Sequence, residues 1–137
     1  MSPTYVSARV RRQVYERASG RCEYCLLSSL DAFFPHESDH IIAEKHGGAT
    51  TIENLALACF DCNRFKGSDI ASLDPGTGDL VALFNPRTQG WNEHFSLTSG
   101  LIVALTSCGS VTVRLLKLNL PARVEAREAL ASRGRYP

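Results

Sequence analysis

The fold is decided by residues 22–66, which read CEYCLLSSLDAFFPHESDHIIAEKHGGATTIENLALACFDCNRFK. The stretch holds one Cys-x-x-Cys turn near its start and another near its end. Two such turns supply four soft ligands in the tetrahedral arrangement that zinc prefers, and they close the chain between them into a loop. In a small domain, such an ion contributes much of the folding free energy. The spacing therefore predicts a structural Zn²⁺ bound by Cys22, Cys25, Cys59 and Cys62.

Length and composition predict a single globular domain of 137 residues, with an apolar fraction of 44% and a net charge of +1. Such a balance argues against a strongly basic protein that coats nucleic acid. No stretch approaches the roughly 18–20 apolar residues of a membrane span, and the N-terminus lacks a signal pattern. We therefore expect a cytoplasmic protein whose thiols stay reduced and bind metal. The fifth cysteine, Cys108, we expect as a buried apolar thiol.

Periodicity predicts the elements around the cysteine turns. A helix is expected over residues 7–18, with Ser7 as its N-cap and Arg9, Arg11, Arg12 and Arg17 on a solvated face or, as the alternative, on phosphate. Residues 26–34 should connect to the next element and bury Phe33 and Phe34. A strand over residues 37–42, a loop over 43–51 containing Gly47-Gly48, a returning segment over 52–58 and a helix over 60–69 should follow.

The sequence after residue 70 predicts an extension that contains both strands and helices. Turns are expected over residues 74–79 and 85–90, and strands over 80–84 and 101–105. Residues 111–118 fit either a strand or a helix, and their spacing favours the helix. A last helix is expected over residues 119–132, with Pro121 in its first turn.

Motifs between and beside the cysteine turns resemble the HNH endonuclease family. They are Asp39-His40-Ile41-Ile42, His46-Gly47-Gly48, Asn54-Leu55-Ala56-Leu57-Ala58-Cys59 and Cys62-Asn63-x-x-Lys66. Weaker resemblances to small bacterial stand-alone HNH proteins lie at residues 83–87 and 91–95. The resemblance implies an α+β fold. It would have a ββα-metal core over about residues 20–70 with a four-cysteine zinc knuckle, an N-terminal helix, and a strand and helix extension over about 78–133. We expect all of this in one HNH nuclease domain of residues 1–137.

The residues within these motifs suit phosphodiester hydrolysis, which needs a base to activate water and a cation to stabilise the phosphate. His40 carries an imidazole, the side chain that most often serves as a general base, and is the candidate for that role. Asp39 and the side-chain carbonyl of Asn63 are hard oxygen ligands for Mg²⁺ or Mn²⁺. The resemblance implies that Asn54 holds the loop and orients His40. Because neighbours on a strand face opposite sides, we expect the strand to end or kink at His40.

The expected partner is double-stranded DNA, cut with weak sequence preference. Lys45, Arg64 and Lys66 flank the motifs and are candidate phosphate contacts, with solvated charge as the alternative. We expect His36 and His46 to be loop residues and His94 to pack against Trp91 and Phe95. Two other functions remain open: a non-catalytic zinc-ribbon module that binds nucleic acid, and a structural protein in which only the zinc knuckle matters. The oligomeric state is not predicted.

Overall fold

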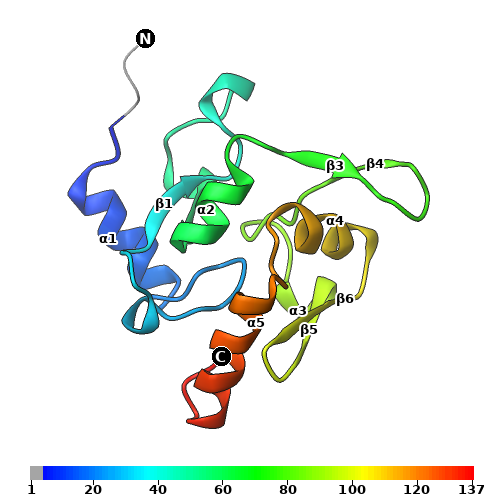
Figure 1. Cartoon of the computed structure of the whole chain (residues 1–137). Helices are drawn as coiled ribbons and strands as arrows, with labels where there is room; N and C mark the ends of the chain where they lie inside the picture. The colour runs from blue at the N-terminus through cyan, green and yellow to red at the C-terminus, as the bar shows by residue number, and fades with distance from the viewer. Residues whose placement is uncertain (1–4) are drawn as a thin grey trace.

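The computed structural model describes residues 5–137 (Figure 1). Residues 1–4 lie outside the described residues. They make up most of the N-terminal stretch in which a signal pattern is not expected. The fold is α+β, as predicted. Its helices are α1 (Ala8–Arg17), α2 (Phe60–Lys66), α3 (Trp91–His94), α4 (Ser107–Leu115) and α5 (Pro121–Ser132). Its strands are β1 (Glu37–His40), β2 (Leu55–Ala58), β3 (Ala71–Leu73), β4 (Leu80–Ala82), β5 (Phe95–Thr98) and β6 (Leu101–Ala104).

The ββα unit follows the cysteine spacing. Strands β1 and β2 pair antiparallel, with Glu37 opposite Ala58 and His40 opposite Leu55. Helix α2 begins directly afterwards, and the sulfur of Cys59 caps it by accepting a hydrogen bond from the Cys62 amide at 3.4 Å. The first strand ends at His40, as predicted from the need for Asp39 and His40 to serve one site.

Strand β2 is buried along its whole length because both of its faces are covered. Leu55 and Leu57 pack with Val14 of α1, whereas Ala56 and Ala58 belong to the main core. This is the period-two alternation of a strand covered on both faces. Helix α1 is therefore part of the scaffold. It starts at the predicted cap, where the Ser7 hydroxyl accepts from the Val10 amide at 3.2 Å.

The C-terminal extension consists of two hairpins and two helices. Strands β3 and β4 form a hairpin that projects to the right in Figure 1, and β5 and β6 form a second hairpin. Helix α4 confirms that residues 111–115 are helical, although it begins at Ser107 and ends before residue 118. Helix α5 confirms the last helix, which begins at Pro121 and not at residue 119. Strands β3 and β5 were not predicted, because three or four residues of mixed polarity give too short a pattern to separate from a turn.

One main core joins the cysteine turns to the extension. Its buried members include Cys22, Tyr24, Ile41 and Ala58 from the ββα unit and Phe84, Phe95, Ile102, Val111, Leu116 and Leu118 from the extension. The rings of Phe84 and Phe95 meet edge to face at 5.3 Å. The aromatic side chains that cover the inner side of the cysteine turns thus come from the second half of the chain.

The prediction that Phe33 and Phe34 lie in the core is wrong. Their side chains are 94% and 48% exposed. A short 3-10 turn, Ser29–Asp31, and then Pro35 carry the connector outward, and Leu27 is the connector residue that packs on the main core. The buried aromatic residues of the main core include Phe84 and Phe95 of the extension. Cys108 also differs from the prediction, since it is only partly buried, at the edge of the main core.

Over residues 5–137, no helix has the length and apolar character needed to cross a membrane.

Candidate active site and zinc knuckle

The four predicted cysteines converge at the junction of the ββα unit and the extension. Their sulfur atoms all lie within 4.8 Å of one another, and those of Cys25 and Cys59 are 3.6 Å apart. Tetrahedral zinc with bonds of about 2.3 Å to sulfur separates its ligands by roughly 3.8 Å, so this cluster fits a structural zinc ion. Within the described chain, no other group of three or more His, Cys, Asp or Glu side chains gathers in this way.

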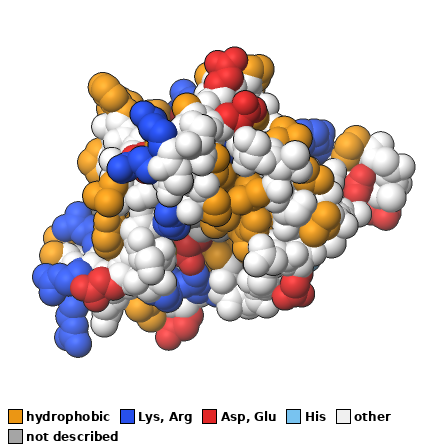
Figure 2. Space-filling view, turned by 90° about the horizontal axis from the view of Figure 1, so that it is seen from below, with side chains coloured by type: hydrophobic (Ala, Val, Ile, Leu, Met, Phe, Trp, Pro, Cys, Tyr) orange, Lys and Arg blue, Asp and Glu red, His pale blue; other side chains and the backbone are white. Residues whose placement is uncertain are grey.

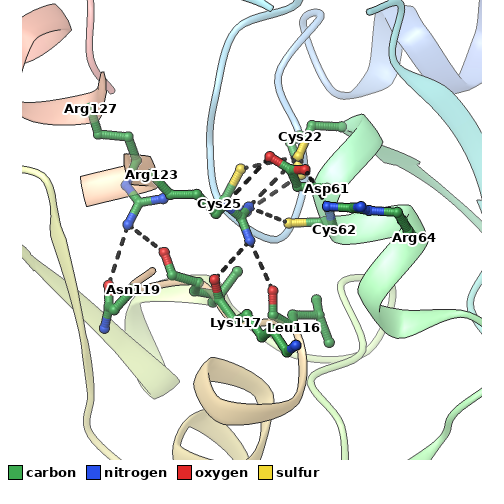
Figure 3. A network of polar contacts seen from close by, with 12 residues as sticks. Cys22, Cys25, Asp61, Cys62, Arg64, Leu116, Lys117, Asn119, Arg123 and Arg127 are labelled. Carbon is green, nitrogen blue, oxygen red and sulfur yellow. Dashed lines mark hydrogen bonds and ion pairs between the residues drawn. The ribbon is translucent and has the colours of Figure 1, made fainter. Parts of the chain in front are cut away.

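Arg123 of α5 lies against this cluster (Figure 3). Its Nη2 is 3.1 Å from the Cys62 sulfur and 3.8 Å from the Cys59 sulfur, while its Nη1 donates to the carbonyls of Leu116 and Lys117. Its Nε lies 3.9 Å from Asp61, and the side chain is only 9% exposed. One guanidinium therefore joins the zinc knuckle to the turn between α4 and α5.

The pKa values of the knuckle cysteines are shifted in both directions. Hydrogen bonds from the neighbouring cysteines hold the pKa of Cys25 well below its ordinary value, whereas burial raises the pKa of Cys22 and Cys62. Burial lowers the pKa of Arg123, but the neighbouring sulfurs outweigh this effect and the net shift is upward. A permanent cation beside the sulfurs favours their negative form.

A second site opens beside the end of β1. A hollow of about 250 Å³ is lined by Asp39 and His40 from β1, Asn63 from α2, and Ser38, Ala43, Glu44, Gly67 and Ser68. The tertiary structure thus brings together the three residues that sequence reasoning assigned to chemistry. They come from a strand end and from the first half of the helix that follows β2.

Asn54 closes the loop that leads away from His40. Its amide nitrogen donates to the carbonyls of Ile42 and Ala49, at 2.9 Å and 2.8 Å, and its oxygen accepts from the Ile42 amide at 3.0 Å. Gly48 makes this clamp possible, because a Cβ at that position would lie 1.7 Å from the Ile42 carbonyl oxygen. Asn54 lies outside the hollow and contacts the backbone that follows the strand.

Asp39 is buried beside a cation and a phenol. Its Oδ2 lies 3.1 Å from the ammonium of Lys66 and accepts from the Tyr24 hydroxyl at 3.1 Å. Burial raises the pKa of this carboxyl, and Lys66 and Tyr24 oppose that effect. Lys66 also donates to the His40 carbonyl at 2.9 Å. The charge of Lys66 therefore holds Asp39 and the end of β1 in one place.

His40 and Asn63 each have a carboxylate neighbour that sequence reasoning missed. The Nε2 of His40 is 2.8 Å from the Thr50 hydroxyl and 3.7 Å from the Glu44 carboxylate. Asn63 donates from Nδ2 to Glu37 at 3.0 Å. The pattern held a signal for Glu37, which stands two residues before Asp39 and so shares its strand face. No comparable signal marked Thr50, Tyr24 or Arg123, whose contacts depend on tertiary structure.

The predicted phosphate contacts separate into two kinds. Lys45 and Arg64 are exposed, whereas Lys66 is 2% exposed and its ammonium faces inward. Its placement favours a role in positioning Asp39 over a role in contacting phosphate. On α1, Arg17 donates to the carbonyls of Ile52 and Leu55, so this member of the arginine set supports the fold.

The other histidines hold the scaffold together. His36 contacts the Leu27 carbonyl at 2.8 Å and His46 contacts the Ser68 carbonyl at 3.1 Å. His94 contacts the Thr106 hydroxyl at 2.7 Å, and its ring lies 5.9 Å from that of Phe84. Each of the three therefore has a neighbour that a structural role explains.

Comparison with known families matches residues 22–69 to the HNH endonuclease family. This segment runs from the first cysteine of the knuckle to just beyond α2, and it contains the hollow and the zinc ligands. The resemblance drawn from the motifs is therefore confirmed, and the segment is an HNH-type domain, which indicates nuclease activity or nucleic-acid binding. No curated protein and no solved structure matches the chain.

Proposed function

We propose that the protein is a metal-dependent endonuclease that hydrolyses phosphodiester bonds in DNA. One observation carries the proposal: a base, a carboxylate and an amide from separate parts of an HNH-type segment line one hollow at its surface. A module that only bound nucleic acid would not need an imidazole beside two hard oxygen donors.

His40 is assigned as the general base that takes a proton from water. Its side chain is 20% exposed, so solvent can reach it. The Thr50 hydroxyl and the Glu44 carboxylate both lie at Nε2 and favour a proton on that nitrogen. Nδ1 is then the nitrogen that accepts the proton, in a tautomer inferred from these contacts. General bases of this kind typically contribute 10²–10⁴-fold to a rate.

Asp39 and Asn63 are assigned to a divalent ion at the hollow. Asn63 uses its NH₂ group on Glu37, which leaves its carbonyl oxygen as the ligand end of the amide. Lys66 and Tyr24 both contact Oδ2 of Asp39, so Oδ1 is the oxygen assigned to the ion. Bound there, Mg²⁺ or Mn²⁺ would act as a Lewis acid on the phosphate. The donors fit such an ion, because both are the hard oxygens that it prefers.

Lys45 and Arg64, both exposed, are assigned to backbone phosphates of double-stranded DNA, with little sequence preference. Lys66 is assigned to positioning Asp39. By analogy with the family, the products would carry 5′-phosphate and 3′-hydroxyl ends. We place the protein in the cytoplasm, where reducing conditions preserve the thiols that bind zinc.

A plasmid-nicking assay tests the assignment. With Mg²⁺ or Mn²⁺, the wild type should convert supercoiled plasmid to open-circular or linear DNA, and His40→Ala should lower the rate at least about 100-fold. His46→Ala is the matched control, since it removes an exposed imidazole from the loop after β1. It costs only a solvent-exposed contact to the Ser68 carbonyl and should leave the rate within about twofold.

Equal cleavage by wild type and His40→Ala, or no cleavage by either with any divalent ion, would reject the catalytic role. DNA binding without cleavage would instead support the non-catalytic zinc module.

A further inference from the structure

A continuous strip of aromatic rings and cations crosses the surface next to the proposed active site. We call it the aromatic–cation strip and define it by six residues: Phe33, Phe34, Phe60, Arg64, Phe65 and Lys117. The rings of Phe33 and Phe34 lie 5.0 Å apart, and those of Phe34 and Phe60 lie 4.6 Å apart. The guanidinium of Arg64 lies 5.3 Å from the Phe60 ring and 4.4 Å from the Phe65 ring. The ammonium of Lys117 is 4.9 Å from the Phe65 ring.

Several aromatic rings of the strip are exposed to solvent and are not part of the hydrophobic core. Phe33 is 94% exposed, and Phe60 is 43% exposed although it opens the helix that carries Asn63. Beside Phe33 and Phe60, the connector and α2 enclose a hollow of about 280 Å³. The connector runs along the lower left of Figure 1, and Figure 2 views the molecule from that lower side, where hydrophobic and Lys or Arg side chains adjoin. Contiguous exposed apolar surface of this kind marks a binding site more often than chance exposure.

The combination of rings and cations identifies the occupant. Aromatic rings stack on nucleic-acid bases, and nearby Arg and Lys side chains neutralise the phosphates that join them. Bases inside a duplex already stack on one another, so rings of this kind bind unpaired bases. Two acids line the hollow beside the strip, and each has a cationic neighbour: Asp31 is paired with Arg135 at 2.6 Å, and Asp61 is paired with Arg64 at 3.2 Å, so both charges are offset.

The strip also lies at the right distance from the proposed chemistry. Phe60 and Asn63 are separated by about 4.5 Å along the axis of α2, because a helix rises 1.5 Å per residue. This is comparable with the 3.4 Å rise between neighbouring nucleotides on one strand of a duplex. A base stacked on Phe60 would therefore be within one or two nucleotides of a phosphate held at Asn63.

From these contacts we infer that the aromatic–cation strip binds unpaired bases next to the cleaved phosphate, so that the preferred substrate is DNA with a single-stranded segment, such as a fork or a flap. This inference rests on the proposed function for its substrate, but its test measures binding alone. It sharpens the proposed specificity from duplex DNA in general to DNA with bases out of the stack.

The test is fluorescence anisotropy with zinc-loaded protein, without Mg²⁺ or Mn²⁺, so that cleavage plays no part. Three labelled probes are compared: single-stranded dT20, a 20-bp duplex, and a forked duplex with a dT10 arm. The wild type should bind dT20 and the fork at least about threefold more tightly than the duplex. Phe33→Leu/Phe34→Leu keeps the apolar character and removes two stacking faces. It should weaken dT20 binding roughly tenfold and leave duplex binding unchanged.

Leu30→Ala is the matched control, because Leu30 is an 81% exposed apolar residue on the same connector and has no ring. It should bind all three probes like the wild type. Arg64→Ala should reduce the slope of log affinity for dT20 against log salt by about 0.7, as expected for one phosphate contact on a single strand.

Several results would overturn the inference: unchanged dT20 affinity in the double variant, an equal loss on dT20 and duplex, or an equal loss in Leu30→Ala. Analytical sedimentation can give a further result that overturns the inference. If the wild type is a dimer, while the double variant is a monomer that binds dT20 as tightly as the wild type, the strip is an interface between copies of the chain. A wild type that binds dT20 through these rings but fails to nick plasmid would uphold the strip and reject only the nuclease.

Discussion

The HNH-type segment and the C-terminal extension are stabilised by different means. In the segment, the interior beside the candidate active site combines the four cysteines and the Asp39–Lys66 ion pair with apolar side chains such as Tyr24 and Ile41. In the extension, the interior is made of apolar side chains such as Phe84, Phe95, Ile102 and Leu118. The part of the chain that carries the candidate chemistry therefore adds a cluster of potential metal ligands and a buried ion pair to its own apolar side chains, and the extension supplies further apolar cover.

The two regions are joined through side chains that cross between them. Arg123 reaches the cysteine sulfurs from α5, and Tyr136 donates from its hydroxyl to the Cys25 carbonyl at 2.6 Å. Trp91 donates from its indole nitrogen to the Tyr24 carbonyl at 2.9 Å. Arg87 pairs with Glu23, whose other oxygen accepts from the Leu57 amide at 2.8 Å. These contacts end on the backbone, the sulfurs or the Glu23 side chain of the cysteine turns, so the extension fixes the knuckle from outside.

The largest effect should come from losing a zinc ligand. Cys62→Ala should abolish zinc binding and unfold the HNH-type segment, because structural zinc contributes on the order of 10 kcal/mol, as much as the total stability of a typical domain. Zinc content by mass spectrometry and helix content by circular dichroism measure this. Cys108→Ala is the matched control, since that thiol lies outside the cluster and should keep one zinc per chain.

If Cys62→Ala remained folded with wild-type helix content, the contrast between a metal-supported segment and an apolar extension would be wrong.

The next effect should come from the buried ion pair. Lys66→Met leaves the Asp39 carboxylate without its cation in a site where that carboxylate is 6% exposed. We expect a loss of about 3–5 kcal/mol in the free energy of unfolding, measured by urea denaturation. Lys45→Met, an exposed lysine from the neighbouring loop, should change stability by less than about 0.5 kcal/mol.

Lys66→Met/Asp39→Asn should recover part of this loss, because the unpaired charge is then removed as well. Equal stabilities for Lys66→Met and Lys45→Met would show that the ion pair does not support the segment.

The smallest of the three effects should come from the contact between the two regions. Arg123→Ala removes the cation beside the Cys62 and Cys59 sulfurs, and groups in this position typically change metal affinity about tenfold or more. We expect a chelator to withdraw zinc from this variant roughly tenfold faster than from the wild type. The control is Arg133→Ala, an exposed arginine at the end of the same helix. Identical rates of zinc release for the two variants would show that Arg123 covers the knuckle without changing its affinity for zinc.

Local pattern was sufficient where neighbours in sequence set the geometry. The two Cys-x-x-Cys turns, the Ser7 cap and the place of Pro121 in the first turn of α5 all depend on residues a few positions apart. The motif around Asp39, His40 and Asn63 identified the residues of the hollow for the same reason, because a short hairpin and the helix after it leave few ways to arrange them. The strand predicted over residues 37–42 was too long, because the chain leaves β1 after His40.

Sequence pattern gave wrong predictions of burial where the burial of a side chain depended on which distant segment packed against it. Two adjacent phenylalanines, Phe33 and Phe34, are typical of a core, and nothing in the connector shows that they lie exposed while Phe84 and Phe95 are buried. A lysine three residues after Asn63 resembles an exposed phosphate contact until β1 is placed against α2 and buries it beside Asp39.

By itself, the sequence predicted the four cysteines that gather, the ββα order and the three residues that meet at the hollow, because ligand type and spacing are chemical properties of a short stretch. The tertiary structure alone decided which charges are buried, that Arg123 meets the sulfur of Cys62 from 61 positions away, and that aromatic rings lie exposed beside the site. Those features depend on packing between segments far apart in the chain, and burial is a property of the whole fold.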